Sequence, residues 1–145
     1  AWDAGALDHW DRYETFMSPR FLDGQTREET LQTRIWRAQL REFMPLIDEE
    51  RQRLERWIKT VPLESEPEYP LEIGPLSYLL RYDAKARLQT SKARRDAAEW
   101  LRKARNFLAH RTTLRADFIA DGRRLLDADR SQSDSARFRR LNVDG

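Results

Sequence analysis

The residues best suited to chemistry lie in one short segment, KARNFLAHRTTL, which spans residues 103–114. It contains Arg105, Asn106 and His110 in the pattern R-N-x-x-x-H, and His110 is one of only two histidines in the chain. Histidine titrates near neutral pH and can donate or accept a proton. Arginine can neutralise the charge that develops on a phosphate oxygen, and asparagine can hold the histidine ring or a phosphate oxygen. This set of side chains suits phosphate-ester chemistry without a metal ion.

RNA supplies its own nucleophile for such a reaction, because a 2′-hydroxyl lies next to each phosphodiester. Internal attack would leave a 2′,3′-cyclic phosphate and a 5′-hydroxyl. One histidine cannot easily act as base and acid at once, so two copies of the site in a symmetric dimer would divide the roles. Arg102, Lys103 and Arg111 flank the motif and are candidates for binding the RNA backbone.

Helical geometry complicates this arrangement. In a regular helix Asn106 and His110 lie one turn apart on one face, whereas Arg105 and His110 lie about 140° apart around the axis. The motif therefore requires a long reach by Arg105, an irregular helix, or partner residues from another chain. The alternative is that these residues share a helix without any chemical role, as most surface or interface residues do.

The elements that must position the motif are predicted to be helical nearly throughout. Apolar residues recur at spacings of three and four, with no sustained alternation of period two. The 145 residues correspond to one domain, and 36% of them are charged, which is typical of long helices with solvated outer faces. The absence of cysteine excludes disulfides, thiolate metal sites and a cysteine nucleophile. The net charge of +2 does not by itself predict a nucleic-acid-binding protein.

Particular residues suggest where these helices begin and end. Thr26 and Glu29 have the form of a capping box, and Pro45 is expected to kink or split the following helix near residues 41–44. The charged run 48–53 is assigned to the outer face of that helix. Ser91 is predicted to cap the helix that contains the motif. The expected helices cover residues 3–17, 26–61, 75–89, 92–110 and 114–129, with an extended acidic, proline-rich loop over 62–75.

These elements predict an all-α fold, an antiparallel bundle of four to five helices. Its inward-facing residues include Leu31 and Ile35. Residues 1–130 are expected to form one domain, and 131–145 a polar, basic tail. The chain begins without methionine, so we expect a processed chain or part of a longer protein. No apolar run approaches the roughly 18 residues of a membrane helix, and no signal peptide is visible, so a cytoplasmic protein without a membrane partner is expected.

The wider segment WLRKARNFLAH, on the fourth helix of a small bundle, resembles the HEPN superfamily. The signature of that family is an arginine, commonly followed by a polar residue, and then a histidine four to six positions after the arginine. Arg105, Asn106 and His110 match it, and the resemblance is strong over about residues 96–114. It implies an all-α, HEPN-like bundle that dimerises with two motifs facing each other across the interface. Many such proteins are metal-independent endoribonucleases of toxin–antitoxin, CRISPR and phage-defence systems.

We therefore expect an endoribonuclease domain of a prokaryotic toxin or phage-defence effector that cleaves single-stranded RNA. Arg105, Asn106 and His110 would be catalytic, with no metal and no cofactor. The expected partners are RNA, a second copy of the chain, and other domains or subunits of a defence complex. Trp100 and Phe107 are expected to supply an apolar contact between the two copies.

Two alternatives stay open. The first is a catalytically inactive HEPN module that dimerises or binds a partner domain, because other members of the superfamily serve as interaction or nucleotide-binding modules. The second is a helical interaction domain in which the motif is accidental. A metal site at His9, between Asp8 and Asp11, is a weaker hypothesis than a solvated helix face there.

Overall fold

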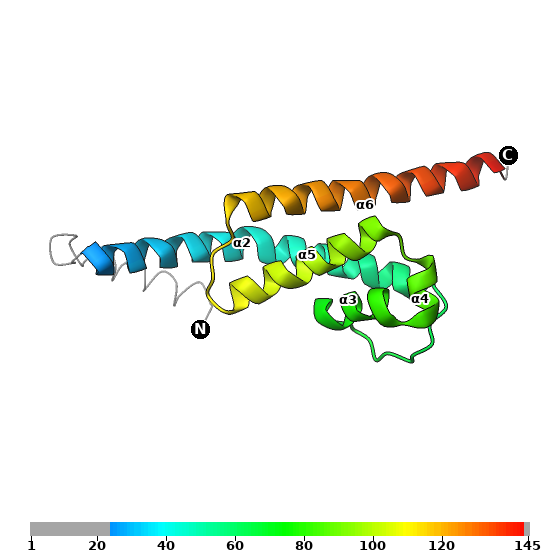
Figure 1. Cartoon of the computed structure of the whole chain (residues 1–145), viewed down its shortest axis with the longest axis horizontal. Coiled ribbons are helices and arrows are strands. Elements are labelled where there is room, and N and C mark those ends of the chain that lie inside the picture. Colours follow the sequence, from blue (N-terminus) through cyan, green and yellow to red (C-terminus); the bar gives the residue numbers. More distant parts are fainter. Residues whose placement is uncertain (1–23, 144–145) are drawn as a thin grey trace.

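The computed structural model describes residues 24–143, and all regular secondary structure in that range is helical. α5 runs in the opposite direction to α2 and α6 (Figure 1). The predicted all-α bundle is confirmed for this part of the chain, while the helix expected over 3–17 lies outside it. The elements in order are α2 (Gly24–Ile58), α3 (Ile73–Tyr82), α4 (Ala84–Gln89), α5 (Lys92–Ala109) and α6 (Ala116–Val143).

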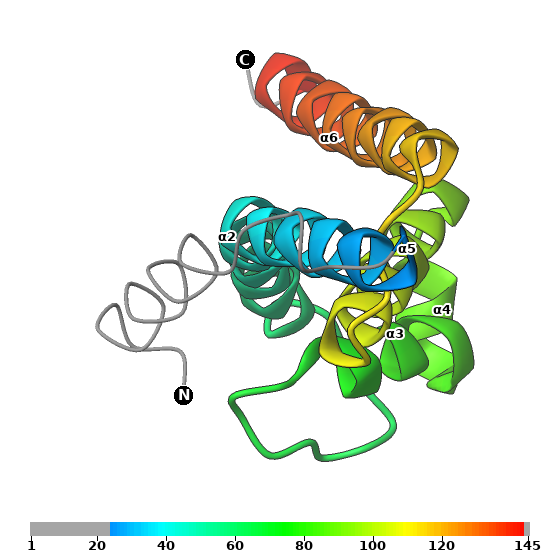
Figure 2. The ribbon, with the colours of Figure 1, turned by 90° about the vertical axis from the view of Figure 1, so that its left-hand side faces the viewer.

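α5 lies at the centre of the bundle. It contacts α2, α3 and α6, and a view along the bundle shows α6 on one side of it and α3 with α4 on the other (Figure 2). The Ser91 side chain accepts a hydrogen bond from the backbone N–H of Arg94 at 3.1 Å, which confirms the predicted N-cap. The buried face of α5 repeats at helical spacing and includes Ala97, Trp100, Leu101, Ala104 and Leu108.

α2 continues without interruption through Pro45, so the predicted split near residues 41–44 is wrong. Pro45 lies on the exposed side of the helix while Phe43 and Ile47 are buried. Water can therefore satisfy the carbonyl that loses its hydrogen bond, and core packing holds the helix together. The predicted capping box at Thr26 is also wrong. α2 already begins at Gly24, so Thr26 lies within the helix.

The first turns of α2, before Trp36, extend beyond the end of α5 (Figure 1). Leu31 and Ile35, which the periodicity assigned to the core, are exposed there. Trp36 is buried instead and marks the start of the packed part of α2. The apolar pattern of α2 thus begins before the part of the helix that its neighbours cover.

The helix expected over 75–89 is broken into α3 and α4 at Asp83, which is buried. The Asp83 carboxylate accepts hydrogen bonds at 3.0 Å from the backbone N–H groups of Ala86, Glu64 and Ser65. Burial acts to raise the pKa of Asp83, but these hydrogen bonds outweigh it and hold the pKa well below its usual range. One carboxylate thus caps α4 and fastens the acidic loop to the bundle.

The charged run 48–53 is only in part the solvated outer face that the sequence predicted: Asp48, Glu49 and Gln52 are exposed, but the other three residues are buried or half-buried. Glu50 is only 2% exposed and pairs with Arg53 at 2.8 Å. Arg53 also reaches Asp129 of α6 at 2.7 Å, and Arg94 of α5 binds the same carboxylate at 2.9 Å. This network joins three helices, and each buried carboxylate in it has a cationic partner, as a buried charge requires.

α6 continues to Val143, so the expected helix end at Asp129 is wrong. Ser133 accepts a hydrogen bond from the Arg94 guanidinium, and its hydroxyl donates to the Asp129 carbonyl at 3.0 Å. Ser133, which lies beyond the expected end, thus joins this part of α6 to Arg94 of α5.

Trp100 packs within the chain and is not available for the predicted dimer contact. It is 4% exposed, its ring stacks on Phe118 with centroids 5.1 Å apart, and its Nε1 donates to the Phe118 carbonyl at 2.9 Å. A Cβ at Gly122 would lie 2.2 Å from the Trp100 ring, so α6 approaches closely only because residue 122 is glycine. Phe107, the other residue of the expected contact, is 42% exposed.

Candidate active site

The R-N-x-x-x-H segment ends α5. Arg105 and Asn106 lie in its last turns, and His110 is the C-cap residue with φ −95° and ψ 19°. The backbone N–H of His110 donates to the Asn106 carbonyl at 3.1 Å. His110 therefore ends the helical hydrogen-bond pattern of α5, and the chain leaves the helix directly after it.

A Schellman-type turn follows His110. The Thr112 N–H donates to the Phe107 carbonyl at 2.8 Å and the Arg111 N–H donates to Leu108 at 3.2 Å, which is the pairing of that motif. Arg111 has a φ of 58°, a left-handed conformation that glycine usually provides. For a residue with a side chain this conformation costs about 1 kcal/mol.

Two side chains of α2 fix both ends of this turn. The Trp36 Nε1 donates to the Leu108 carbonyl at 2.7 Å. The Gln39 side chain donates to the Leu114 carbonyl at 2.9 Å and accepts from the Leu114 N–H at 2.6 Å. His110 is therefore presented by a backbone that is fastened on each side, which is the support that a catalytic side chain requires.

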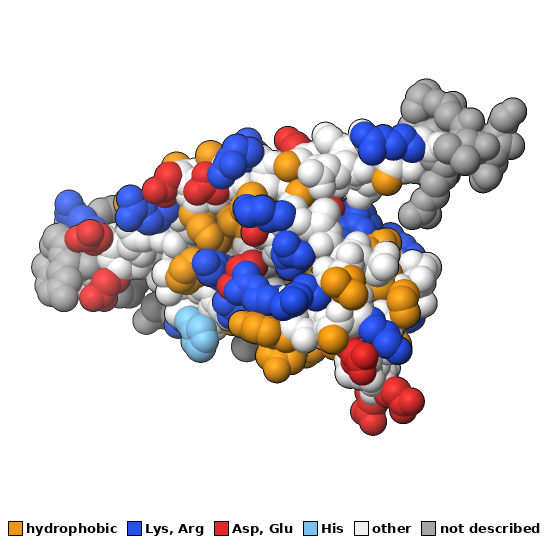
Figure 3. Space-filling model, turned by 45° about the vertical axis from the view of Figure 1, so that its right-hand side comes forward, with side chains coloured by type: hydrophobic (Ala, Val, Ile, Leu, Met, Phe, Trp, Pro, Cys, Tyr) orange, Lys and Arg blue, Asp and Glu red, His pale blue; other side chains and the backbone are white. Residues whose placement is uncertain are grey.

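The three motif side chains have no partner among the described residues. No hydrogen bond, ion pair or ring contact there engages the side chain of Arg105, Asn106 or His110. Arg105 is half-buried, and every other buried or half-buried arginine between residues 26 and 137 takes part in at least one polar, electrostatic or ring interaction. His110 is exposed, and Figure 3 shows histidine at the surface with lysine and arginine side chains gathered on the same face.

The flanking cations differ in their environments. Arg102 is half-buried and pairs with Glu99 at 2.6 and 3.0 Å. The Arg102 hydrogen bond lowers the pKa of Glu99 to about 2, with help from Ser77 and against the effect of burial. Lys103 is exposed, and the Arg111 guanidinium lies 5.1 Å over the Trp36 ring. Of the three candidates for RNA binding, only Arg102 is engaged in an ion pair within the described part of the chain.

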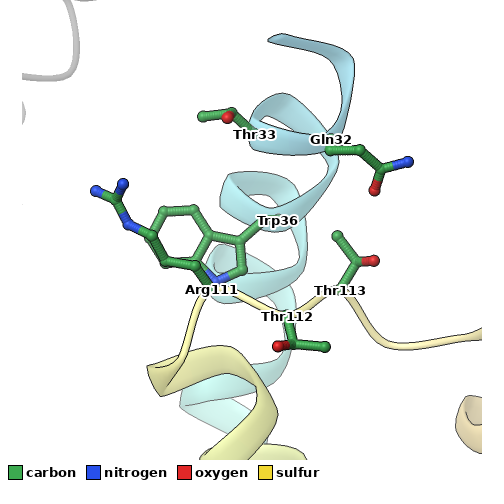
Figure 4. A pocket seen from close by; sticks show the side chains of 6 residues that line it. All are labelled: Gln32, Thr33, Trp36, Arg111, Thr112 and Thr113. Atoms are coloured by element: carbon green, nitrogen blue, oxygen red, sulfur yellow. The ribbon is translucent and has the colours of Figure 1, made fainter. Parts of the chain in front are cut away.

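A hollow of about 360 Å³ opens beside the turn, between α2 and the start of the α5–α6 connection (Figure 4). The sequence gave no indication of it, because its two walls are separated by more than seventy residues and follow no common spacing. It is lined by Gln32, Thr33, Trp36, Arg111, Thr112 and Thr113.

A metal site is not visible in residues 24–143, which contain no group of three or more His, Cys, Asp or Glu side chains arranged to hold an ion. The weaker metal hypothesis at His9, with Asp8 and Asp11, falls outside the described residues. No helix in the described range is long and apolar enough to span a bilayer.

Compared with protein-family models, with curated proteins and with solved structures, the chain has no significant match.

Proposed function

We propose that this chain is an HEPN-type endoribonuclease domain that cleaves single-stranded RNA without a metal ion. The observation that supports the proposal is the environment of the Arg105 and His110 side chains. Arg105 is half-buried without a polar partner among the described residues, and His110 is exposed on a turn that α2 holds at both ends. A partly desolvated guanidinium without a counter-charge favours an anion, and an RNA phosphodiester provides one.

The chemistry assigns a role to each side chain. His110 accepts the proton of the 2′-hydroxyl as the 2′-oxygen forms a bond to phosphorus. The bond from phosphorus to the 5′-oxygen breaks, and the leaving oxygen takes a proton from a second histidine. Arg105 stabilises the negative charge on the non-bridging oxygens, and Asn106 orients His110 or the phosphate. The products are a 2′,3′-cyclic phosphate and a 5′-hydroxyl.

The second histidine comes from another copy of the chain in this proposal. The reaction needs an acid and a base together, and His110 is the one histidine in residues 24–143. A two-fold dimer with the C-terminal ends of both α5 helices near the axis brings two copies of the motif together. Phe107 is exposed beside the motif and provides an apolar contact for such an interface. The biological setting that fits is a prokaryotic toxin or phage-defence effector.

A catalytically inactive HEPN module is the second candidate. The observation that favours it lies on α3, where Tyr78 and Tyr82 are 64% and 61% exposed and pack on each other with ring centroids 4.8 Å apart. Exposed aromatic side chains of this kind are common in interfaces with other proteins. An inactive module would bind a partner through such a surface and would not cleave RNA.

RNA cleavage by matched variants in EDTA tests the proposal. The wild-type chain should cleave a fluorescent single-stranded RNA with EDTA present. His110→Ala should lower the rate about 10²–10⁴-fold, which is the usual loss for a general acid or base. Arg105→Ala should be comparably severe, and Arg105→Lys should restore little because an ammonium cannot replace a planar fork of donors.

Arg115→Ala is the matched control, since Arg115 is an arginine near the motif whose side chain is 83% exposed. It should cleave at the wild-type rate. Arg51 and Arg53 are unsuitable controls, because both are half-buried in ion pairs. Circular dichroism of each variant shows whether the fold is kept. Loss of activity on adding EDTA, with recovery on adding magnesium, would contradict the proposed chemistry.

A further inference from the structure

Four of the side chains that line the hollow beside the turn carry hydrogen-bonding groups without a hydrogen-bond or ion-pair partner among the described residues. The guanidinium of Arg111, the hydroxyls of Thr112 and Thr113, and the amide of Gln32 make no hydrogen bond or ion pair with the described residues. No acidic residue lines the hollow. A cation and unpaired donors that line one hollow, without a carboxylate among them, favour an anionic ligand over a metal or an amine.

The backbone sets the position of the cation. Arg111 has a positive φ of 58°, and its guanidinium lies 5.1 Å over the Trp36 ring. Figure 4 shows the Arg111 guanidinium at the outer edge of the indole, on the same side of α2 as Thr33, whereas Gln32 and Thr113 lie on the opposite side. Stacking on a ring occupies one face of a guanidinium and leaves its in-plane N–H donors available, which is how arginine commonly binds phosphate.

The hollow also lies next to the proposed catalytic residue. Arg111 directly follows His110, and Cα atoms joined by a trans peptide are about 3.8 Å apart. A volume of about 360 Å³ falls in the range of small-ligand pockets and exceeds what a phosphate group alone needs. The site is therefore suited to one nucleotide of a strand that passes His110.

We propose that this pocket is a subsite that binds the phosphate of the nucleotide next to the cleaved bond in single-stranded RNA. Arg111, at one side of the hollow, supplies the charge that binds the phosphate, and Thr112, Thr113 and Gln32 supply hydrogen bonds to the rest of that nucleotide. This inference rests on the proposed function, because it takes the strand to be held for cleavage at His110. The pocket gives Arg111 a positioning role, and it accounts for an arginine at a backbone position that favours glycine.

Binding of an RNA that cannot be cleaved tests the subsite. The probe is a 2′-O-methyl RNA oligonucleotide, which lacks the nucleophile, and its binding is measured by fluorescence anisotropy over a series of salt concentrations. Arg111→Gly should keep the fold, because the turn accommodates glycine at φ 58°. It should weaken binding about 10-fold or more, as expected for a lost charge-assisted hydrogen bond. The slope of log affinity against log salt should fall by about 0.7, the value for one phosphate contact on a single strand.

Further variants distinguish binding in the pocket from nonspecific attraction of RNA to positive charge. Arg115→Ala removes the same charge nearby, outside the pocket lining, and should weaken binding less than Arg111→Gly. Gln32→Ala and Thr113→Val change no charge. They should still weaken binding of the RNA, because each removes a hydrogen bond that the pocket provides. Wild-type affinity in Arg111→Gly together with Gln32→Ala would overturn the subsite. Equal competition by a mononucleotide and by the oligonucleotide would also overturn it, because the pocket would then serve a free nucleotide.

The outcome for the subsite is distinguishable from that for the proposed function. His110→Ala should abolish cleavage of RNA but weaken binding of the 2′-O-methyl probe less than Arg111→Gly does, since His110 acts in proton transfer. If the wild-type chain cleaves no RNA while Arg111→Gly loses binding, the cleavage proposal fails and the RNA-binding pocket stands. If the chain cleaves RNA while Arg111→Gly binds normally, the subsite fails and the cleavage proposal stands.

Discussion

Two arginines one turn apart on α5 differ in their surroundings. Arg102 is held by two hydrogen bonds to Glu99, whereas Arg105 has no polar partner among the described residues. Both residues were singled out from the sequence, and one signal there separates them: Glu99 lies three residues before Arg102 on the same helix, whereas no acid lies three or four residues from Arg105. The contact of Glu99 with Ser77 of α3 at 3.1 Å could not be read from the sequence. The spacing of residues in the sequence predicted which side chains could be catalytic or bind RNA. The contacts in the structure show which of these side chains are already paired within the described part of the chain.

The ion pair between Glu99 and Arg102 should make the stability of the fold depend on pH in the acidic range. The Arg102 hydrogen bond lowers the pKa of Glu99 from 4.5 to about 2. The folded chain therefore keeps this carboxylate ionised at pH values where the unfolded chain has protonated it. Its contribution to the free energy of unfolding is complete above pH 4.5 and is lost as the pH falls towards 2. Urea unfolding of the wild-type chain and of Glu99→Gln across this range measures the effect.

The comparison with Glu99→Gln isolates this carboxylate from the other acids. Asp83 also has a lowered pKa, and its effect on stability is present in both chains. The difference in unfolding free energy between the two chains should shrink as the pH falls from 4.5 to 2. A difference that stays constant over that range would show that the Glu99–Arg102 pair does not stabilise the fold.

At the scale of elements, prediction succeeded where a helix is defined by local chemistry. Ser91 caps α5 as expected, and the apolar stripe of α5 faces the core, because both features depend on neighbours within a few residues. Two helix ends, the break at Asp83 and the end of α6, were missed for a common reason. Asp83 breaks the third helix by binding a loop about twenty residues away, and Asp129 lies within α6 because it pairs with α2 and α5.

The contact between α5 and α6 depends on residue 122 having no side chain. In Gly122→Ala the new Cβ would lie 2.2 Å from the Trp100 ring, so the ring or the helix must move. Forcing an extra methyl into a packed contact of this kind costs about 1–3 kcal/mol. We expect a loss of that size in the free energy of unfolding, even though alanine is the better helix former. Chemical denaturation monitored by tryptophan fluorescence measures it.

Gly74→Ala provides the matched control. It makes the same change in α3, where a Cβ would meet nothing within 4 Å apart from its chain neighbours. This variant should change the free energy of unfolding less than Gly122→Ala does, because alanine favours the helix while Pro75 disfavours a side chain before it. If Gly122→Ala were as stable as Gly74→Ala, the close approach of α6 to Trp100 would not matter to the fold.

At the scale of the whole molecule, the motif is positioned by a helix far away in the sequence. Trp36 and Gln39 hold the turn after His110 across separations of 72 and 75 residues. No spacing rule links these residues to the motif, so neither they nor the pocket beside the turn were predicted. The sequence identified the candidate catalytic side chains. The hydrogen bonds from Trp36 and Gln39 that support the turn could be found only from the packing of α2 on α5.

The dimer in the proposed function is a prediction about the assembled molecule. Light scattering at high micromolar concentration should give about twice the chain mass of 17.3 kDa. Phe107→Asp should shift the population towards the monomer, because it places a charge on the exposed apolar residue beside the motif. Tyr78→Asp changes an exposed aromatic residue on α3 and should leave the dimer intact. Dissociation by Tyr78→Asp rather than by Phe107→Asp would move the interface away from the motif.

Cleavage of RNA with a single altered sugar tests the central claim most directly. One oligonucleotide is all RNA, and a second has 2′-deoxyribose on the 5′ side of the bond that is cut in the first. In EDTA, the wild-type chain should cut the first, leaving a 2′,3′-cyclic phosphate, and should leave the altered bond of the second intact. His110→Ala should cut neither at a comparable rate. Cleavage of the deoxy-substituted bond, or wild-type cleavage by a folded His110→Ala chain, would contradict a ribonuclease centred on Arg105 and His110.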